Sequence, residues 1–79
     1  MKITVRIFGY LRMYGNRRSS EEFTIDVQPQ ATAQDLLKAL AIPETEDVVV
    51  VINNNIAPVK SQVLREHDVV LVYPFLGGG

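Results

Sequence analysis

The feature that constrains the fold most is a single helical stripe with strand-like segments on both sides of it. Apolar side chains stand at the i, i+3, i+4, i+7 spacing of one helix face at Ala33, Leu36, Leu37 and Leu40. Thr32 predicts the helix N-cap, and Asp35 three residues later forms a variant of the capping box. Pro43 cannot continue a helix, so this one is about two to three turns long and buries one face.

Strand patterns fill most of the remaining chain. Apolar and polar residues alternate over residues 2–9 and again over 23–28, which predicts two half-buried strands that pair as a hairpin. The β-branched run at residues 48–52 is the strongest strand signal. Residues 56–60 predict a short edge strand, and residues 69–73 predict the last strand.

The connections between these segments carry turn signals. Residues 53–55 are three asparagines and residues 67–68 are His-Asp, and both predict turns because Asn and His reach positive φ more readily than most residues. Residues 61–66 predict a short helical turn that places Val63 and Leu64 inward. No second full helix is predicted after the stripe.

The order strand, strand, helix, strand, short strand, strand predicts an α+β fold, a roll of the β-grasp type with a mixed four- to five-stranded sheet and one main helix. The ferredoxin-like split fold is the alternative, but it needs a second full helix. A chain of 79 residues has room for one small domain. We expect this domain to span residues 1–74 and a flexible Gly-rich C-terminal tail to span residues 75–79.

Composition excludes several classes of function. Eight basic and nine acidic residues give a net charge of −1, which argues against nucleic-acid or polybasic membrane binding. The absence of cysteine excludes disulfides, a thiol nucleophile and a cysteine metal site, and the one histidine, His67, has no companion ligands, so no metal site is expected. No apolar run reaches the ~20 residues that cross a bilayer, and no signal peptide precedes the first strand, so we expect a soluble cytoplasmic protein.

The end of the chain is uncharged after Asp68. If Val70 and Val72 face the helix, Val69 and its alternating neighbours face away, where a lone helix leaves the sheet uncovered. A continuous apolar run is also typical of a strand buried on both faces. We favour an exposed apolar patch that docks a partner. Its expected members are Leu71, Tyr73, Pro74, Phe75 and Leu76.

The order of elements, the length and the terminal Gly78-Gly79 resemble the ubiquitin-like sulfur carriers of the MoaD and ThiS family. Its members typically close with a Gly-Asp turn, an apolar strand, one or two prolines, a short apolar stretch and Gly-Gly. The sequence departs from that pattern at His67 in the turn, at Phe75 in place of a second proline, and at Gly77. A frayed end or an expression scar is the alternative reading of the three terminal glycines.

The resemblance implies that the α-carboxylate of Gly79 is the reactive group. A ubiquitin-activating-type adenylyltransferase would adenylate it with ATP, and a sulfur donor such as a cysteine desulfurase or rhodanese would displace AMP and leave a thiocarboxylate. The chain itself would be a non-catalytic carrier subunit with no bound cofactor. Gly77 and Gly78 would thread a narrow channel in which a Cβ would collide with the walls. Residues 74–79, if extended, reach about 20 Å.

Length and the long segment after the first strand favour the small subunit of molybdopterin synthase, paired with a large catalytic subunit. A ThiS-like carrier for thiamin thiazole synthesis is the closest alternative. A ubiquitin-like modifier joined through Gly79 to a partner lysine is another, and a plain interaction module is a third. The sequence does not separate carrier from modifier, because both begin with the same adenylate.

Two further groups of residues are expected to be ordinary. Tyr10 and Tyr14 lie in a predicted helical turn and are read as packing residues. Basic side chains at Arg12, Arg17, Arg18 and Lys60 could meet an acidic partner surface or a phosphate, but a solvated loop is the favoured reading.

Overall fold

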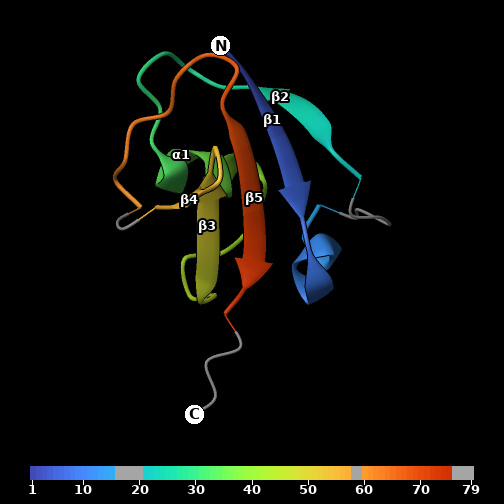
Figure 1. The fold of residues 1–79 in the computed structure, drawn as a ribbon. Helices are drawn as coiled ribbons and strands as arrows, with labels where there is room; N and C mark the ends of the chain where they lie inside the picture. The colour runs from blue at the N-terminus through green and yellow to red at the C-terminus, as the bar shows by residue number, and fades with distance from the viewer. Residues whose placement is uncertain (16–20, 58–59, 76–79) are drawn as a thin grey trace.

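The computed structural model describes residues 1–15, 21–57 and 60–75. In that part of the chain, five strands form one mixed sheet and one α-helix lies against a single face of it (Figure 1). The elements are β1 (Lys2–Ile7), the 3-10 helix η1 (Gly9–Met13), β2 (Phe23–Asp26), α1 (Ala33–Ala39), β3 (Val48–Ile52), β4 (Asn55–Ile56) and β5 (Val69–Pro74).

The strand order is β2-β1-β5-β3-β4, with β5 at the centre. β1 and β5 run parallel, and the pairs β1–β2, β3–β5 and β3–β4 run antiparallel. A hairpin, a crossover helix and a last strand inserted parallel to the first one make the roll that the sequence predicts, and the β-grasp fold class is confirmed. None of the helices among the described residues has the length and apolar character needed to cross a bilayer.

The hydrophobic core lies between α1 and the sheet. The whole predicted stripe is buried, with Leu36 and Leu40 fully so. It packs in one cluster with the inward residues of β1 and β5, which are Ile3, Val5, Ile7, Val70 and Val72. Each buried leucine of the stripe stabilises the fold by roughly 1.5–3 kcal/mol through apolar area removed from water. One helix therefore covers one face of the sheet.

The predicted capping box starts α1. The Thr32 Oγ1 accepts a hydrogen bond from the Asp35 N–H at 3.2 Å, and the Thr32 N–H donates to the Asp35 Oδ2 at 2.9 Å. The backbone hydrogen bond from Thr32 is the main cause that lowers the pKa of Asp35, followed by the side-chain hydrogen bond with Thr32. The ionised carboxylate is thus preferred in the folded state.

We expect the Asp35→Asn variant to lose stability at neutral pH and to lose less of it on acidification than the wild type does. The lowered pKa contributes stability that is present above the ordinary value of 3.8 and is lost as pH falls through the folded-state value. Urea unfolding between about pH 5 and about pH 2 measures this difference. Asp26→Asn, which removes an exposed carboxylate outside the helix, is the control. A stability difference for Asp35→Asn that stays constant with pH would contradict the cap assignment.

The turn predictions are confirmed at Asn53, Asn54 and His67, whose φ angles are 50°, 72° and 69°. Asn55, the third residue of the predicted asparagine turn, instead begins β4. The edge strand predicted at 56–60 is found only in part: β4 spans Asn55–Ile56, Ala57 and Lys60 are outside any strand, and residues 58–59 lie outside the described residues.

The predicted helical turn at residues 61–66 is wrong. Ser61 and Glu66 lie in turns, and the chain between them forms an isolated antiparallel bridge between Val63 and Thr32. Its backbone is held by hydrogen bonds with the residues that lead into α1, including Leu64 N–H to Ala31 O at 2.8 Å. Neighbours in an extended chain point to opposite sides, so Leu64 is buried whereas Val63 is 52% exposed, contrary to its predicted inward position.

Candidate functional site

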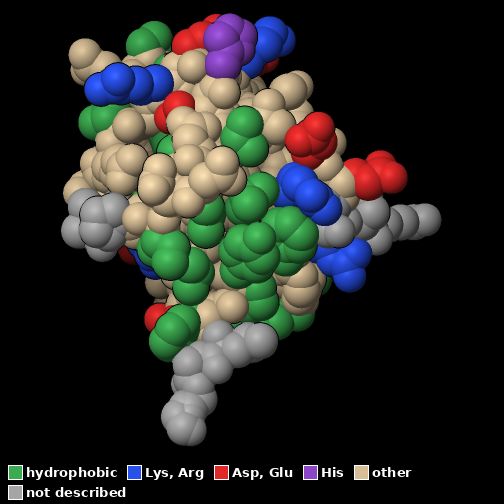
Figure 2. Space-filling model, viewed as in Figure 1, with side chains coloured by type: hydrophobic (Ala, Val, Ile, Leu, Met, Phe, Trp, Pro, Cys, Tyr) green, Lys and Arg blue, Asp and Glu red, His purple; other side chains and the backbone are tan. Residues whose placement is uncertain are grey.

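The sheet face opposite α1 carries a patch of apolar side chains, which gather over the centre of the sheet in Figure 2. Alternation along β5 sends Val70 and Val72 to the core and leaves Leu71 and Tyr73 on this open face. Cross-strand register adds Val51, which stands opposite Leu71, and further partners from β3 and β4. We call this set the open-face patch: Phe8, Val49, Val51, Ile56, Val69, Leu71 and Tyr73.

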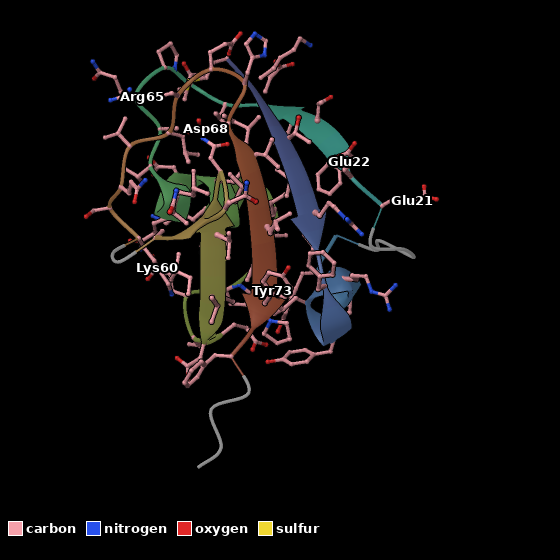
Figure 3. All side chains as sticks on the ribbon, viewed as in Figure 1. Glu21, Glu22, Lys60, Arg65, Asp68 and Tyr73 are labelled. Carbon is pink, nitrogen blue, oxygen red and sulfur yellow. The ribbon has the colours of Figure 1, made fainter. Side chains whose placement is uncertain are left out.

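The patch contains an aromatic pair at the junction of β1 and β5. The rings of Phe8 and Tyr73 stack with centroids 4.5 Å apart and an interplanar angle of 4°. The Arg6 guanidinium carbon lies 4.8 Å from the centroid of the Phe8 ring. Tyr73 is labelled in Figure 3, near the end of β5. Tyrosine and arginine are among the residue types enriched where binding energy concentrates at protein interfaces.

The end of β5 is held by hydrogen bonds on both sides. We call Pro74 and Phe75, where the tail begins, the base of the tail. On the β1 side, the Phe8 N–H donates to the Val72 carbonyl at 2.9 Å, and on the β3 side the Phe75 N–H donates to the Asp47 carbonyl at 3.0 Å. Gly9 has a φ of +66°, and a Cβ there would lie 2.9 Å from Pro74 Cγ. Glycine therefore allows η1 to lie directly against the last residue of β5.

The structure brings together the predicted docking residues that it describes. Leu71 and Tyr73 are half-buried on the open face, Pro74 ends β5, and Phe75 is 56% exposed. Leu76 and the predicted reactive or tail-threading glycines, Gly77, Gly78 and Gly79, lie outside the described residues.

Sequence reasoning missed Arg6 and Phe8 as members of the same site. Their alternation with Val5 and Ile7 places them on the outer side of β1, which was a usable signal. What it does not give is the parallel pairing of β1 with β5, because that joins segments far apart in the chain.

A second arrangement below the end of β5 was also missed. The hydroxyls of Tyr10 and Tyr14 donate to the two carboxylate oxygens of Glu46, the first at 2.9 Å to Oε1 and the second to Oε2. We call these three residues the Tyr–Glu clasp. The hydrogen bond to Glu46 is the main cause that raises the pKa of each tyrosine, so both hydroxyls remain protonated donors at neutral pH.

Both tyrosines of the clasp were predicted to be packing residues, and the structure confirms this for Tyr14 but not for Tyr10. Tyr14 packs partly against the core, as expected, but Tyr10 is 49% exposed and is anchored through its hydroxyl instead. Glu46 lies 36 residues from Tyr10 and 32 from Tyr14, and no local pattern links them.

Asp68 is the one buried acid in the part of the chain that the structure describes. It accepts hydrogen bonds from the Asn53 amide and the Arg65 N–H, each at 2.8 Å, and holds two turns together. Within the described ranges, no group of three His, Cys, Asp or Glu side chains could hold a metal ion. β5 combines two features: it contributes apolar side chains to the open face, and it leads into a tail that has no charged side chain and ends in glycines.

Comparison with solved structures finds chains of the same fold. SAMP1 from Haloferax volcanii has a TM-score of 0.71 and 22% identity, with all of both chains covered. A putative molybdopterin converting factor subunit 1 from Pyrococcus furiosus has a TM-score of 0.72 and 23% identity, covering 92% of this chain and 95% of that one. A complex of subunits 1 and 2 of the molybdopterin-converting factor from Helicobacter pylori 26695 has a TM-score of 0.64 and 21% identity, again over all of both chains.

Comparison by sequence is more specific about the family. Curated protein sequences gave no significant match. The model of the ThiS family matches residues 5–79, which include the helix, the terminal glycines and every strand except the first three residues of β1. The family expected from the end of the sequence is thereby confirmed, and this chain belongs to the ThiS family.

Proposed function

We propose that the chain is a sulfur carrier whose Gly79 carboxylate is adenylated and then converted to a thiocarboxylate, in a role like that of the small subunit of molybdopterin synthase. The observation that carries the proposal is the continuity of the open-face patch with the tail. The patch residues Val69, Leu71 and Tyr73 belong to β5, the tail is the extension of that strand, and Phe75 is held at the point where the tail begins. A partner that binds the patch therefore receives the tail in a defined direction.

The chemistry needs no catalytic side chain from this protein. A carboxylate is a poor electrophile, so one of its oxygens first attacks the α-phosphorus of ATP and displaces pyrophosphate, which gives an acyl-adenylate. A donor persulfide then attacks the acyl carbon and AMP leaves. A second thiolate breaks the sulfur–sulfur bond, forms a disulfide with the donor, and releases the thiocarboxylate. ATP is bound by the adenylyltransferase, and the persulfide comes from a cysteine desulfurase or rhodanese.

The consumer of the sulfur is proposed to be a large molybdopterin synthase subunit. Support comes from the Helicobacter pylori structure, in which subunit 1, a chain of the same fold, is found in complex with subunit 2. The open-face patch is the surface on which such a subunit would dock. Because the pathway begins with ATP, we place the protein in the cytoplasm.

A ubiquitin-like modifier is the second candidate. The Haloferax volcanii protein of the same fold is described as small archaeal modifier protein 1. A modifier would use the same adenylate but transfer Gly79 to an amine of another protein. The family match also leaves thiamin thiazole synthesis as a destination of the sulfur.

The intact mass after incubation with ATP, an activating enzyme and a sulfur donor tests the proposal. A gain equal to the replacement of one oxygen by sulfur supports the carrier, and reactions without ATP should show no gain. Ladders of conjugates with other proteins would favour the modifier. An unchanged mass with every candidate activating enzyme would refute both.

A further inference from the structure

We propose that the Tyr–Glu clasp positions the base of the tail for the partner's active site, with Tyr10, Tyr14 and Glu46 as positioning residues. The functional half of this inference rests on the function proposed above. The structural half concerns only the contacts of the described residues and stands independently of it.

The clasp joins the two elements that flank the end of β5. β5 lies between β1 and β3 in the sheet. Both tyrosines belong to the segment that follows β1, and Glu46 lies two residues before β3 begins. Their hydrogen bonds therefore connect the neighbours of β5 across the place where the tail leaves the sheet.

The residues next to the clasp are the ones that hold the base of the tail. Gly9, which precedes Tyr10, lies against Pro74, and Asp47, which follows Glu46, accepts the hydrogen bond from the Phe75 N–H. Opening the clasp would let these two contacts move apart. The chain at Phe75 would then leave the sheet in many directions, and fewer of them would present the tail correctly to a bound partner.

The clasp lies outside the open-face patch. Tyr14 packs against the core cluster, so its ring is on the side of the sheet that α1 covers. Substitutions that remove only the tyrosine hydroxyls should therefore leave the docking surface intact. This separation predicts that the clasp affects the rate of tail chemistry more than the affinity for the partner.

The test is the double variant Tyr10→Phe/Tyr14→Phe, which keeps both rings and removes both donors. Thr32→Ala is the matched control, because it weakens the helix cap away from the tail and lowers global stability. Tyr10→Phe alone serves if the double variant does not fold.

We expect amide hydrogen exchange at Phe75 to accelerate about tenfold in the double variant beyond any change in the control, with Val72 exchanging as in the control. With an activating enzyme of the ubiquitin-activating type and ATP, we expect kcat for adenylation to fall about tenfold while the dissociation constant is unchanged.

Hydrogen exchange tests the structural half of the inference, and the kinetic and binding measurements test the functional half. Exchange at Phe75 that accelerates no more than in Thr32→Ala would show that the clasp does not hold the base of the tail. Accelerated exchange with an unchanged kcat would overturn the positioning role. A weaker affinity with unchanged kcat would assign the clasp to docking instead. If no activating enzyme adenylates the wild type, the proposed function fails, and the exchange data still decide the structural half.

Discussion

Removal of Gly79 is expected to abolish formation of the acyl-adenylate while the fold remains intact. The shortened chain still ends in two glycines, Gly77 and Gly78, so the variant tests reach rather than glycine content. One residue of extended chain spans about 3.5 Å. A misplacement of about 1 Å can cost on the order of 100-fold in rate, so a carboxylate this far short should not react. ATP–pyrophosphate exchange measures the reaction, and circular dichroism with thermal unfolding checks the fold.

Two controls of unchanged length separate reach from chemistry. Gly77→Ala keeps both the length and the terminal Gly78-Gly79 but adds a Cβ to a residue that would thread the channel, so we expect it to be adenylated more slowly than the wild type and still far faster than the shortened chain. A chain whose Gly79 carries a carboxamide keeps the length and lacks the carboxylate, and we expect no adenylation at all. Wild-type activity in the shortened chain, or any adenylation of the carboxamide, would refute a mechanism centred on the Gly79 carboxylate.

The local features of the fold were predictable because short-range interactions determine them. The capping box of Thr32 and Asp35, and the alternation that turns Val70 inward and Leu71 outward, depend on residues close together in the chain. The uncovered sheet face was predictable because the sequence contains one main helix, and one helix covers only one of the two faces of a sheet. Of the candidate site, the residues of β5 were therefore found in advance.

The parts that were not predictable depend on contacts between distant segments. Val63 points outward because residues 61–66 pair with the entrance to α1, and this pairing overrides the local preference for a helical turn. The Phe8–Tyr73 stack needs the parallel register of β1 and β5. The contact between Glu46 and Tyr10 depends on α1 crossing the sheet and on β3 lying beside β5. A single sequence contains no local pattern that predicts such contacts between distant segments.

The substitution of aspartate at two adjacent positions of β5 is expected to separate binding from folding. Val70 is fully buried against the core, and an unpaired carboxylate there costs several kcal/mol, a large part of the stability of a small domain. We expect Val70→Asp to be unfolded. Leu71 is half-buried on the uncovered face and stands opposite Arg6 in β1. A carboxylate at position 71 remains near water and near that cation, so we expect Leu71→Asp to fold with a loss of about 1 kcal/mol or less.

The same Leu71→Asp variant should lose its partner. Its side chain lies at the centre of the open-face patch, between Val51 and Arg6 in the register of the sheet. A charge buried at the middle of an apolar interface typically costs about 2 kcal/mol or more, or about 30-fold in affinity. Calorimetric titration with the activating enzyme and with a large subunit measures it. Val69→Asp, at the more exposed edge of the patch, should weaken binding less, since its side chain is already 40% exposed. An unfolded Leu71→Asp would place Leu71 in the core, and a folded variant with wild-type affinity for both partners would remove the open face from the docking surface.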